Sequence, residues 1–188
     1  MIESKNIFLV GPMGAGKSTI GKVLAEILGK EFYDSDREIE QSTGANIPWI
    51  FDVEGEAGFR EREIRMIDKL TKKKDMVLAT GGGAILAKKN RKRLKKRGTV
   101  VFLRASIAQQ VERTSRDRNR PLLQTPDPKK TIKELMELRE PLYQEVADIV
   151  VETNRRSARA VSKEIAKQLQ RLAQGAETHA NQKSEGTG

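Results

Sequence analysis

The residues from Gly11 to Ser18 read Gly-Pro-Met-Gly-Ala-Gly-Lys-Ser and match the pattern G-x-x-x-x-G-K-[ST] at every fixed position. In this pattern glycines let backbone N–H groups close around phosphate oxygens, and the N-terminus of the following helix adds partial positive charge. We expect Lys17 to reach the β- and γ-phosphates of a nucleotide and the Ser18 hydroxyl to bind Mg²⁺. The pattern therefore predicts a site for a nucleoside triphosphate and its metal ion.

The segments on both sides of this loop support the prediction. Asn6-Ile-Phe-Leu-Val10 is a short apolar run, as a buried parallel strand requires. The stretch from Thr19 to Leu28 has apolar residues at helical spacing. Strand, glycine loop and helix in this order favour a phosphate-binding loop over a chance match in a turn.

Two carboxylates two residues apart, Asp34 and Asp36, follow a second β-like run. In an extended chain residues i and i+2 point to the same side, so one carboxylate could lie near Mg²⁺ and the other at an acceptor hydroxyl. The alternative is a polar strand end at which Asp36 caps the next helix. Both interpretations stay open on the sequence alone.

Arginines and glycines further along the chain are candidates for binding the acceptor. Arg60 and Arg139 could converge on an anionic substrate, because guanidinium groups match carboxylates. Arg60 also lies in a run of alternating Glu and Arg, which favours a surface position for its neighbours. Three consecutive glycines, Gly81 to Gly83, cost backbone entropy and favour a place where another molecule approaches the chain closely.

Arg120 lies in the segment Ser115–Lys130, which is rich in Arg, Pro and Asp and has no apolar periodicity. We predict a long loop here. An arginine on a mobile loop above a phosphate loop is typical of a lid that brings positive charge to the transferred phosphoryl group. The alternative is one more basic residue in a basic protein.

The elements that must position these residues follow an alternating pattern. Five β-like runs are separated by helical stretches, which predicts an α/β fold with a five-stranded parallel sheet flanked by helices. Ligands of such sheets bind at the carboxyl ends of the strands, where these motifs fall. The predicted strands are Ile7–Val10, Glu31–Asp34, Met76–Ala79, Val100–Leu103 and Ile149–Val151.

Three other segments have predicted roles in this arrangement. Ser35–Leu70 is long for one crossover and mostly helical in pattern, so it could form a small cap over the sheet. The last helix is expected from Ser157 to about Leu172. Gln174–Gly188 is polar, and we expect it to be disordered.

Composition limits the possible classes of protein. A length of 188 residues predicts one domain, and the absence of cysteine excludes disulfides, thiolate metal sites and a cysteine nucleophile. We find neither a signal peptide nor a membrane span, so the expected location is the cytoplasm. The net charge of +10 raises the question of nucleic acid, and eight of the ten residues in Lys88–Arg97 are basic. Aromatic stacking residues are scarce, so we interpret that run as a solvated helix face and do not expect nucleic acid as a partner.

Taken together, the motifs resemble the shikimate kinase family over about residues 5–172. The phosphate loop is generic to many NTPases, whereas the other motifs in this order and spacing are specific. The matching segments are Gly11–Ser18, Asp34-Ser-Asp36, Gly55–Arg60, Gly81-Gly-Gly83, Arg120-Pro-Leu-Leu123 and Leu138-Arg-Glu-Pro-Leu-Tyr143. The resemblance implies a P-loop fold related to nucleoside monophosphate kinases. Its kinase domain would span residues 1–173, with a helical substrate-binding insertion at about 35–70 and a mobile lid at about 113–127, and a tail would follow at 174–188.

The resemblance also implies an activity and a set of site residues. The activity is Mg²⁺- and ATP-dependent phosphorylation of the 3-hydroxyl of shikimate, giving shikimate 3-phosphate in chorismate and aromatic amino-acid biosynthesis. The implied shikimate contacts are Asp36, Arg60, Gly82 and Arg139. The implied ATP contacts are Gly14, Ala15, Gly16, Lys17, Ser18, Thr19, Arg120 and Arg156. Lys17, Asp36 and Arg120 would be catalytic, and Ser18 would bind the metal with Asp34 nearby, through water. The expected partners are these two small molecules, and we expect a monomer.

Two rival functions keep the same phosphate loop. One is a kinase for another small metabolite, such as a nucleoside monophosphate or gluconate, although a nucleotide acceptor would need a stacking aromatic. The other is a P-loop regulator or a nucleic-acid-stimulated ATPase, which the positive charge suggests.

Overall fold

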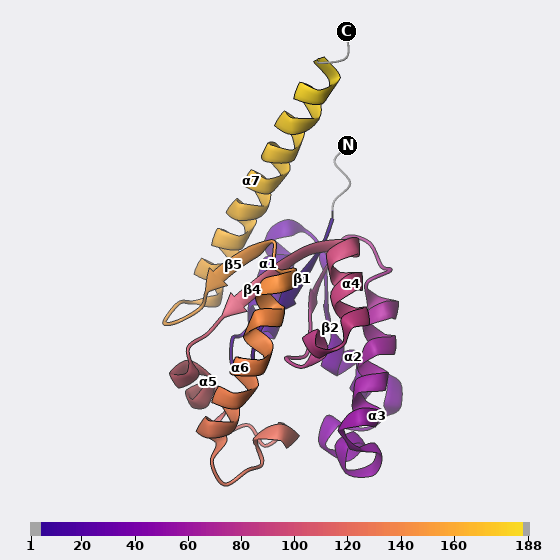
Figure 1. Ribbon diagram of the computed structural model, residues 1–188, viewed down its shortest axis with the longest axis vertical. Helices are drawn as coiled ribbons and strands as arrows, with labels where there is room; N and C mark the ends of the chain where they lie inside the picture. Colours follow the sequence, from indigo (N-terminus) through magenta and orange to yellow (C-terminus); the bar gives the residue numbers. More distant parts are fainter. Residues whose placement is uncertain (1–4, 186–188) are drawn as a thin grey trace.

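The protein forms a five-stranded parallel sheet in a computed structural model that describes residues 5–185, with side chains over residues 5–176. The strand order is β2-β3-β1-β4-β5. Figure 1 shows the sheet among its helices, with β1, β2, β4 and β5 labelled. The strands are β1 (Asn6–Val10), β2 (Glu31–Asp34), β3 (Met76–Ala79), β4 (Gly98–Arg104) and β5 (Ile149–Glu152). All five predicted strands are present, so the predicted fold class is confirmed. β4 begins earlier than predicted because Gly98 and Thr99 also pair with β1.

Helices cover both faces of this sheet. α1 (Lys17–Leu28) and α7 (Ala158–Glu185) pack on one face, and α3 (Ile47–Leu70), α4 (Lys88–Arg97) and α6 (Pro128–Val146) pack on the other. Every residue of β1 is buried, as expected for a strand with both faces covered. The remaining elements are α2 (Ser35–Thr43), α5 (Ile107–Thr114) and two short 3₁₀ turns, Ala84–Leu86 and Pro121–Leu123.

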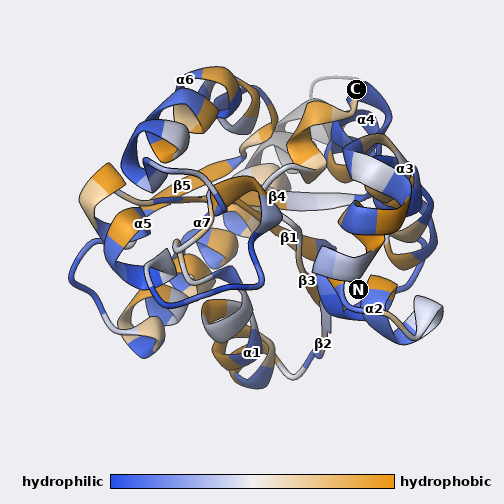
Figure 2. Cartoon of the chain, turned by 90° about the horizontal axis from the view of Figure 1, so that it is seen from below, coloured by the Kyte–Doolittle hydropathy of each residue, from blue (hydrophilic) through white to orange (hydrophobic). Residues whose placement is uncertain are grey.

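The carboxyl ends of the strands lie between two groups of helices. In Figure 2, α2 and α3 stand on one side of these ends, and α5 and α6 stand on the other. The phosphate loop follows β1, α2 follows β2, and the glycine turn follows β3, so three candidate motifs meet at one edge of the sheet.

The predicted cap at 35–70 consists of α2 and α3. α3 is bent at Gly55, whose backbone (φ 70°, ψ 178°) is not helical. The bend divides α3 into a first arm, Ile47–Glu54, and a second arm, Glu56–Leu70.

The predicted loop at Ser115–Lys130 contains more regular structure than expected. α6 begins at Pro128, because the Asp127 side chain caps it by accepting from the backbone N–H of Lys130. Leu123 is buried against Met13 and Ile132, which anchors the middle of the segment. Arg113 and Thr114, the first residues of the predicted lid at about 113–127, belong to α5.

The last helix is longer than predicted. α7 continues to Glu185 and projects beyond the amino ends of the strands (Figure 1), whereas we expected it to end near Leu172 and the chain to be disordered from Gln174. Ala, Gln, Glu and Lys dominate this stretch and favour helix, and the docked part of α7 provides the nucleus. Residues 186–188 lie outside the described residues, and the domain boundary at 173 stays a prediction. Over the part of the chain described here, each helix is too short or too polar to cross a membrane.

Candidate active site

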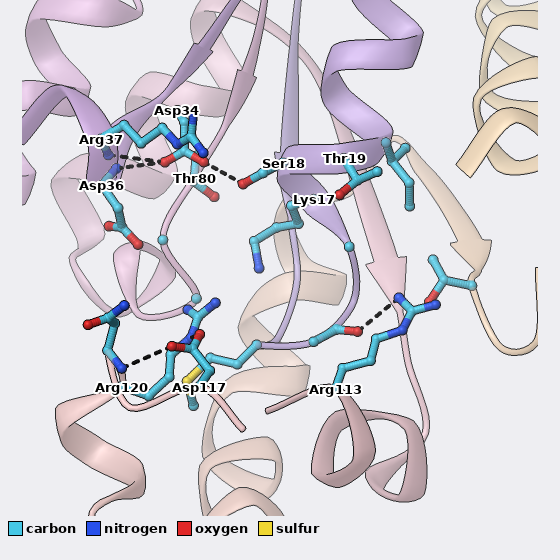
Figure 3. A pocket seen from close by; sticks show the side chains of 18 of the residues that line it. Lys17, Ser18, Thr19, Asp34, Asp36, Arg37, Thr80, Arg113, Asp117 and Arg120 are labelled. Atoms are coloured by element: carbon cyan, nitrogen blue, oxygen red, sulfur yellow. Dashed lines mark hydrogen bonds and ion pairs between the residues drawn. The ribbon is translucent and has the colours of Figure 1, made fainter. Parts of the chain in front are cut away.

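Two adjoining cavities occupy the carboxyl edge of the sheet. The larger has a volume of about 620 Å³ and is lined by the phosphate loop, Asp34, the lid and Arg156 (Figure 3). The smaller, of about 60 Å³, is lined by Arg60, Arg139 and parts of α3. Both cavities share wall residues, which are Met13, Asp36, Ile47, Gly81, Gly82, Asn119 and Arg120. Groups bound in the two cavities would therefore meet beside Asp36 and Arg120.

The phosphate loop closes around its own lysine. Gly11, Gly14 and Gly16 all have positive φ, and a side chain at Gly11 would collide with the backbone carbonyl of Leu103. The Lys17 ammonium donates to the carbonyl oxygens of Gly11 at 2.7 Å and of Pro12 at 2.8 Å. Lys17 is thus held at the floor of the larger cavity, at the N-terminus of α1.

Burial lowers the pKa of Lys17 to about 7, and the positive charge of Arg120 adds to this effect. Asp36 and Asp34 act in the opposite direction. A bound polyphosphate would supply further negative charge and favour the ammonium form. The lysine charge is therefore matched to an anionic ligand.

Asp34 joins the phosphate loop to α2. One carboxylate oxygen accepts a hydrogen bond from the Ser18 hydroxyl. The other caps α2, accepting from the backbone N–H groups of Asp36 at 3.0 Å and of Arg37 at 3.2 Å. The capping residue is therefore Asp34 and not Asp36. Because Asp36 lies in the first turn of α2, the extended alternation does not apply to the pair.

The oxygens of Ser18 and Asp34 are the kind of hard donor that Mg²⁺ prefers. Both residues line the larger cavity beside Lys17. Over the described residues, no group of three or more acidic or histidine side chains gathers to hold a metal ion. A Mg²⁺ ion at this place would therefore take its other ligands from nucleotide phosphates and water, and the residues present fit that arrangement.

Asp36 keeps one carboxylate oxygen free. Its Oδ1 is buried and has no hydrogen-bond partner among the described residues. Burial raises the pKa of Asp36 to about 6, and the nearby Asp34 raises it further. Lys17 and Asp36 point into the larger cavity from opposite sides (Figure 3). A buried carboxylate without a partner is available to a substrate hydroxyl.

Two arginines converge on the smaller cavity. Arg60 donates from Nη1 to Glu63 Oε1 at 2.9 Å, and Arg139 is 3% exposed. The Nε atoms of both arginines are buried and lack partners in the part of the chain with described side chains. Burial lowers the pKa of Arg139 and raises that of Glu63 to about 7. Unpaired guanidinium N–H groups in a pocket are suited to a carboxylate ligand.

Glu63 is buried, although the sequence around it favours an exposed position. The alternation of Glu and Arg favoured a surface position for the neighbours of Arg60, and for Glu63 that interpretation is wrong, because Glu63 is 1% exposed. Its spacing of three residues from Arg60 was the available signal, since residues i and i+3 share a helix face.

The glycine turn after β3 makes room mainly for the protein's own side chains. A Cβ at Gly81 would lie 2.7 Å from Asp36 Oδ1, and one at Gly83 would collide with the Arg60 guanidinium. At Gly82 the nearest atoms are 3.5 Å away, so its backbone borders the cavities without crowding. The Tyr143 hydroxyl donates to the Gly82 carbonyl at 2.5 Å and fixes the turn.

The segment between α5 and α6, which we predicted to be a mobile lid and call the lid, brings Arg120 to both cavities. Its Nε donates to Asp117 Oδ2 at 2.9 Å, an ion pair within the loop. Arg113, at the end of α5, donates to the Gly14 carbonyl at 3.1 Å and lines the larger cavity. Sequence reasoning placed Arg113 only at the edge of the lid, because its contact with the phosphate loop joins residues far apart in the chain.

The remaining predicted residues lie at the margins. Thr19 and Arg156 line the larger cavity, but the Arg156 guanidinium is paired with Glu164 at 2.6 Å. Ala15 does not line either cavity, because its side chain packs into the core. Only the Ala15 backbone could contact a ligand.

Comparison with known proteins agrees with this geometry. The family model described as shikimate kinase matches residues 13–170. The chain is 59% identical over 167 residues to the shikimate kinase of Pseudomonas paraeruginosa, covering 89% of this chain and 97% of that protein. It is 56% identical over 169 residues to a shikimate kinase of Shewanella sp., covering 90% and 99%. The chain belongs to the shikimate kinase family.

A solved member of the family has the same fold. The shikimate kinase from Acinetobacter baumannii, in complex with shikimate, superposes with a TM-score of 0.88 at 53% identity, covering 89% of this chain and 94% of that one. The resemblance inferred from the motifs is therefore confirmed. The roles assigned to individual residues stay predictions.

Proposed function

We propose that this protein transfers the γ-phosphoryl group of ATP to the 3-hydroxyl of shikimate, giving shikimate 3-phosphate. The observation that carries the proposal is the meeting of the two cavities at Asp36 and Arg120. The larger has a phosphate loop on its wall, and the smaller has two arginines. Membership of the shikimate kinase family supports the same reaction.

The larger cavity is suited to ATP. Backbone N–H groups from Gly14 to Thr19 would surround the phosphates at the N-terminus of α1. Lys17 would stabilise the charge on the β- and γ-phosphates. We further propose that Ser18 and Asp34 hold Mg²⁺, which when bound neutralises phosphate charge.

The smaller cavity is suited to a small hydroxylated carboxylic acid. Arg60 and Arg139 would bind the carboxylate of shikimate, with the Gly82 backbone against the ring. The free Oδ1 of Asp36 would orient the 3-hydroxyl and accept its proton as the phosphoryl group leaves ATP. Arg120, in reach of both cavities, would stabilise the charge on the transferred group.

Every residue in this proposed site comes from one chain, so a monomer would suffice for the reaction. The cytoplasm, the location that we propose, would supply ATP.

A coupled assay of ADP release tests the function. With Mg²⁺ and ATP, release should depend on shikimate and should not respond to gluconate, nucleoside monophosphates, RNA or DNA. A Lys17→Met variant, which lacks the ammonium group, serves as the negative control. ADP release that is indifferent to shikimate, or that another acceptor stimulates more strongly, would contradict the proposal.

A further inference from the structure

The bend in α3 depends on a glycine in an unusual conformation. Gly55 has φ of 70°, and among the described residues nothing lies within 4 Å of a Cβ built on it. Space is therefore available, and glycine is needed only because other residues are strained at positive φ. The angle between the two arms must be set by contacts elsewhere.

An ion pair spans the bend. Arg62 Nε donates to Glu54 Oε2 at 2.8 Å, and Arg62 Nη2 donates to Glu54 Oε1 at 2.5 Å. On a straight helix two residues eight apart are separated by a rise of about 12 Å, so this bidentate pair forms only because the bend folds the first arm back. Gly58 lies beneath it, and a Cβ there would be 2.5 Å from that of Glu54.

Two aromatic rings, one on each arm, meet at the smaller cavity. The rings of Phe51, on the first arm, and Phe59, on the second, lie 5.0 Å apart between centroids, and both line that cavity. The Arg60 guanidinium lies 5.3 Å from the Phe59 ring. The angle between the arms therefore determines how Phe51 closes the wall beside Arg60.

We propose that the Glu54–Arg62 ion pair is a positioning clasp that holds the two arms of α3 at the angle that forms the acceptor pocket. This inference rests on the proposed function of that pocket. Neither residue lines either cavity, so the clasp acts through Phe51 and Phe59. Opening it should weaken acceptor binding and leave ATP binding and the phosphoryl transfer step nearly unchanged. Among the described residues, neither Glu54 nor Arg62 lines the larger cavity, and their hydrogen bonds and ion pair are to each other.

Steady-state kinetics of Arg62→Ala and Glu54→Gln test the clasp. We expect KM for shikimate to rise about threefold to tenfold, with kcat and KM for ATP within about twofold of the wild type. The Glu61–Arg65 pair on the same arm provides the matched control. It is 72% and 79% exposed, against 29% and 40% for Glu54 and Arg62, so Arg65→Ala should change none of these constants.

The only tryptophan of the chain gives a readout that does not need activity. Trp49 lies on the first arm and is 55% exposed. Its fluorescence anisotropy should fall in Arg62→Ala and Glu54→Gln, because the first arm gains mobility, and should be unchanged in Arg65→Ala. The charge-exchanged double variant, Glu54→Arg with Arg62→Glu, should recover part of both the anisotropy and the shikimate KM.

Two results would overturn the clasp: folded variants with wild-type anisotropy and wild-type shikimate KM, or a fall in kcat with KM unchanged. If Arg62→Ala does not fold, Glu54→Gln, which keeps the size of the side chain, decides the matter by the same measurements. Failure of the proposed function would look different, since the wild type would then release no ADP in response to shikimate while the anisotropy still changed in the variants.

Discussion

At the scale of single residues, Asp34 and Asp36 have different partners despite their spacing. Asp34 uses both oxygens, one for Ser18 and one as the cap of α2, whereas Asp36 keeps Oδ1 free. Asp36→Asn should therefore lower kcat/KM for shikimate by on the order of a hundredfold and leave ATP binding near normal.

Asp34→Asn should instead raise the Mg²⁺ concentration required for activity. Separate titrations of shikimate and Mg²⁺ measure the two effects, and interchanged phenotypes would mean that the roles are reversed.

Glu63 should link stability to pH. Burial raises its pKa from 4.5 to about 7, so the folded protein holds a proton that the unfolded chain releases between these values. The resulting contribution to the free energy of unfolding is complete below about pH 4.5 and is lost as pH rises through about 7. The glutamine in Glu63→Gln cannot ionise. The free energy of unfolding of this variant should therefore fall less than that of the wild type as pH rises from about 4.5 to about 7.

Urea denaturation of the wild type and of Glu63→Gln at several pH values between about 4.5 and about 7 measures this effect on the free energy of unfolding. Glu61→Gln, which alters an exposed carboxylate on the same helix, should keep the wild-type pH dependence. An unchanged pH dependence in Glu63→Gln would show that Glu63 is ionised in the folded protein throughout the range.

At the scale of elements, the lid should act mainly after both substrates have bound. Arg120 is held by Asp117 within the loop and reaches both cavities. Arg120→Ala should lower kcat on the order of tenfold or more, and shikimate affinity should change less. Arg118→Ala, on the same loop but outside both of these cavities, is the control and should be nearly silent. A loss of shikimate affinity with kcat preserved would contradict a role in the closed state.

Elements with a strong local signal were predictable from the sequence. Short apolar runs predict the strands, the glycines predict the phosphate loop, and apolar residues at helical spacing predict α1. Each of these signals lies within a few neighbouring residues. Contacts between distant segments were not predictable, because no local pattern encodes them. Glu63 is buried beside the glycine turn, where a Cβ at Gly81 would lie 2.9 Å from its Oε2, and Arg113 meets Gly14 only in the folded chain. The cap of α2 was assigned to Asp36 as one alternative, and the structure assigns it to Asp34, since the helix begins two residues earlier, at Ser35.

At the scale of the whole molecule, the catalytic unit and the end of α7 lie apart. Val161 and Ile165 are fully buried against the sheet, whereas Leu172 is exposed, and the family model ends at residue 170. Beyond this point α7 projects past the amino ends of the strands, on the side opposite the phosphate loop (Figure 1). The described side chains from residue 171 to 176 are therefore mostly exposed and add little to the core.

Deletion of Gln174–Gly188 should accordingly leave kcat and both KM values within about twofold of the wild type and change the melting temperature by less than a few degrees. Differential scanning calorimetry and the ADP-release assay measure these quantities. A longer deletion from Ile165 is the matched positive control, because it removes a buried side chain that packs on the sheet and should destabilise the fold strongly. A large fall in melting temperature for the shorter deletion would mean that the end of α7 packs against the protein or a second copy of it.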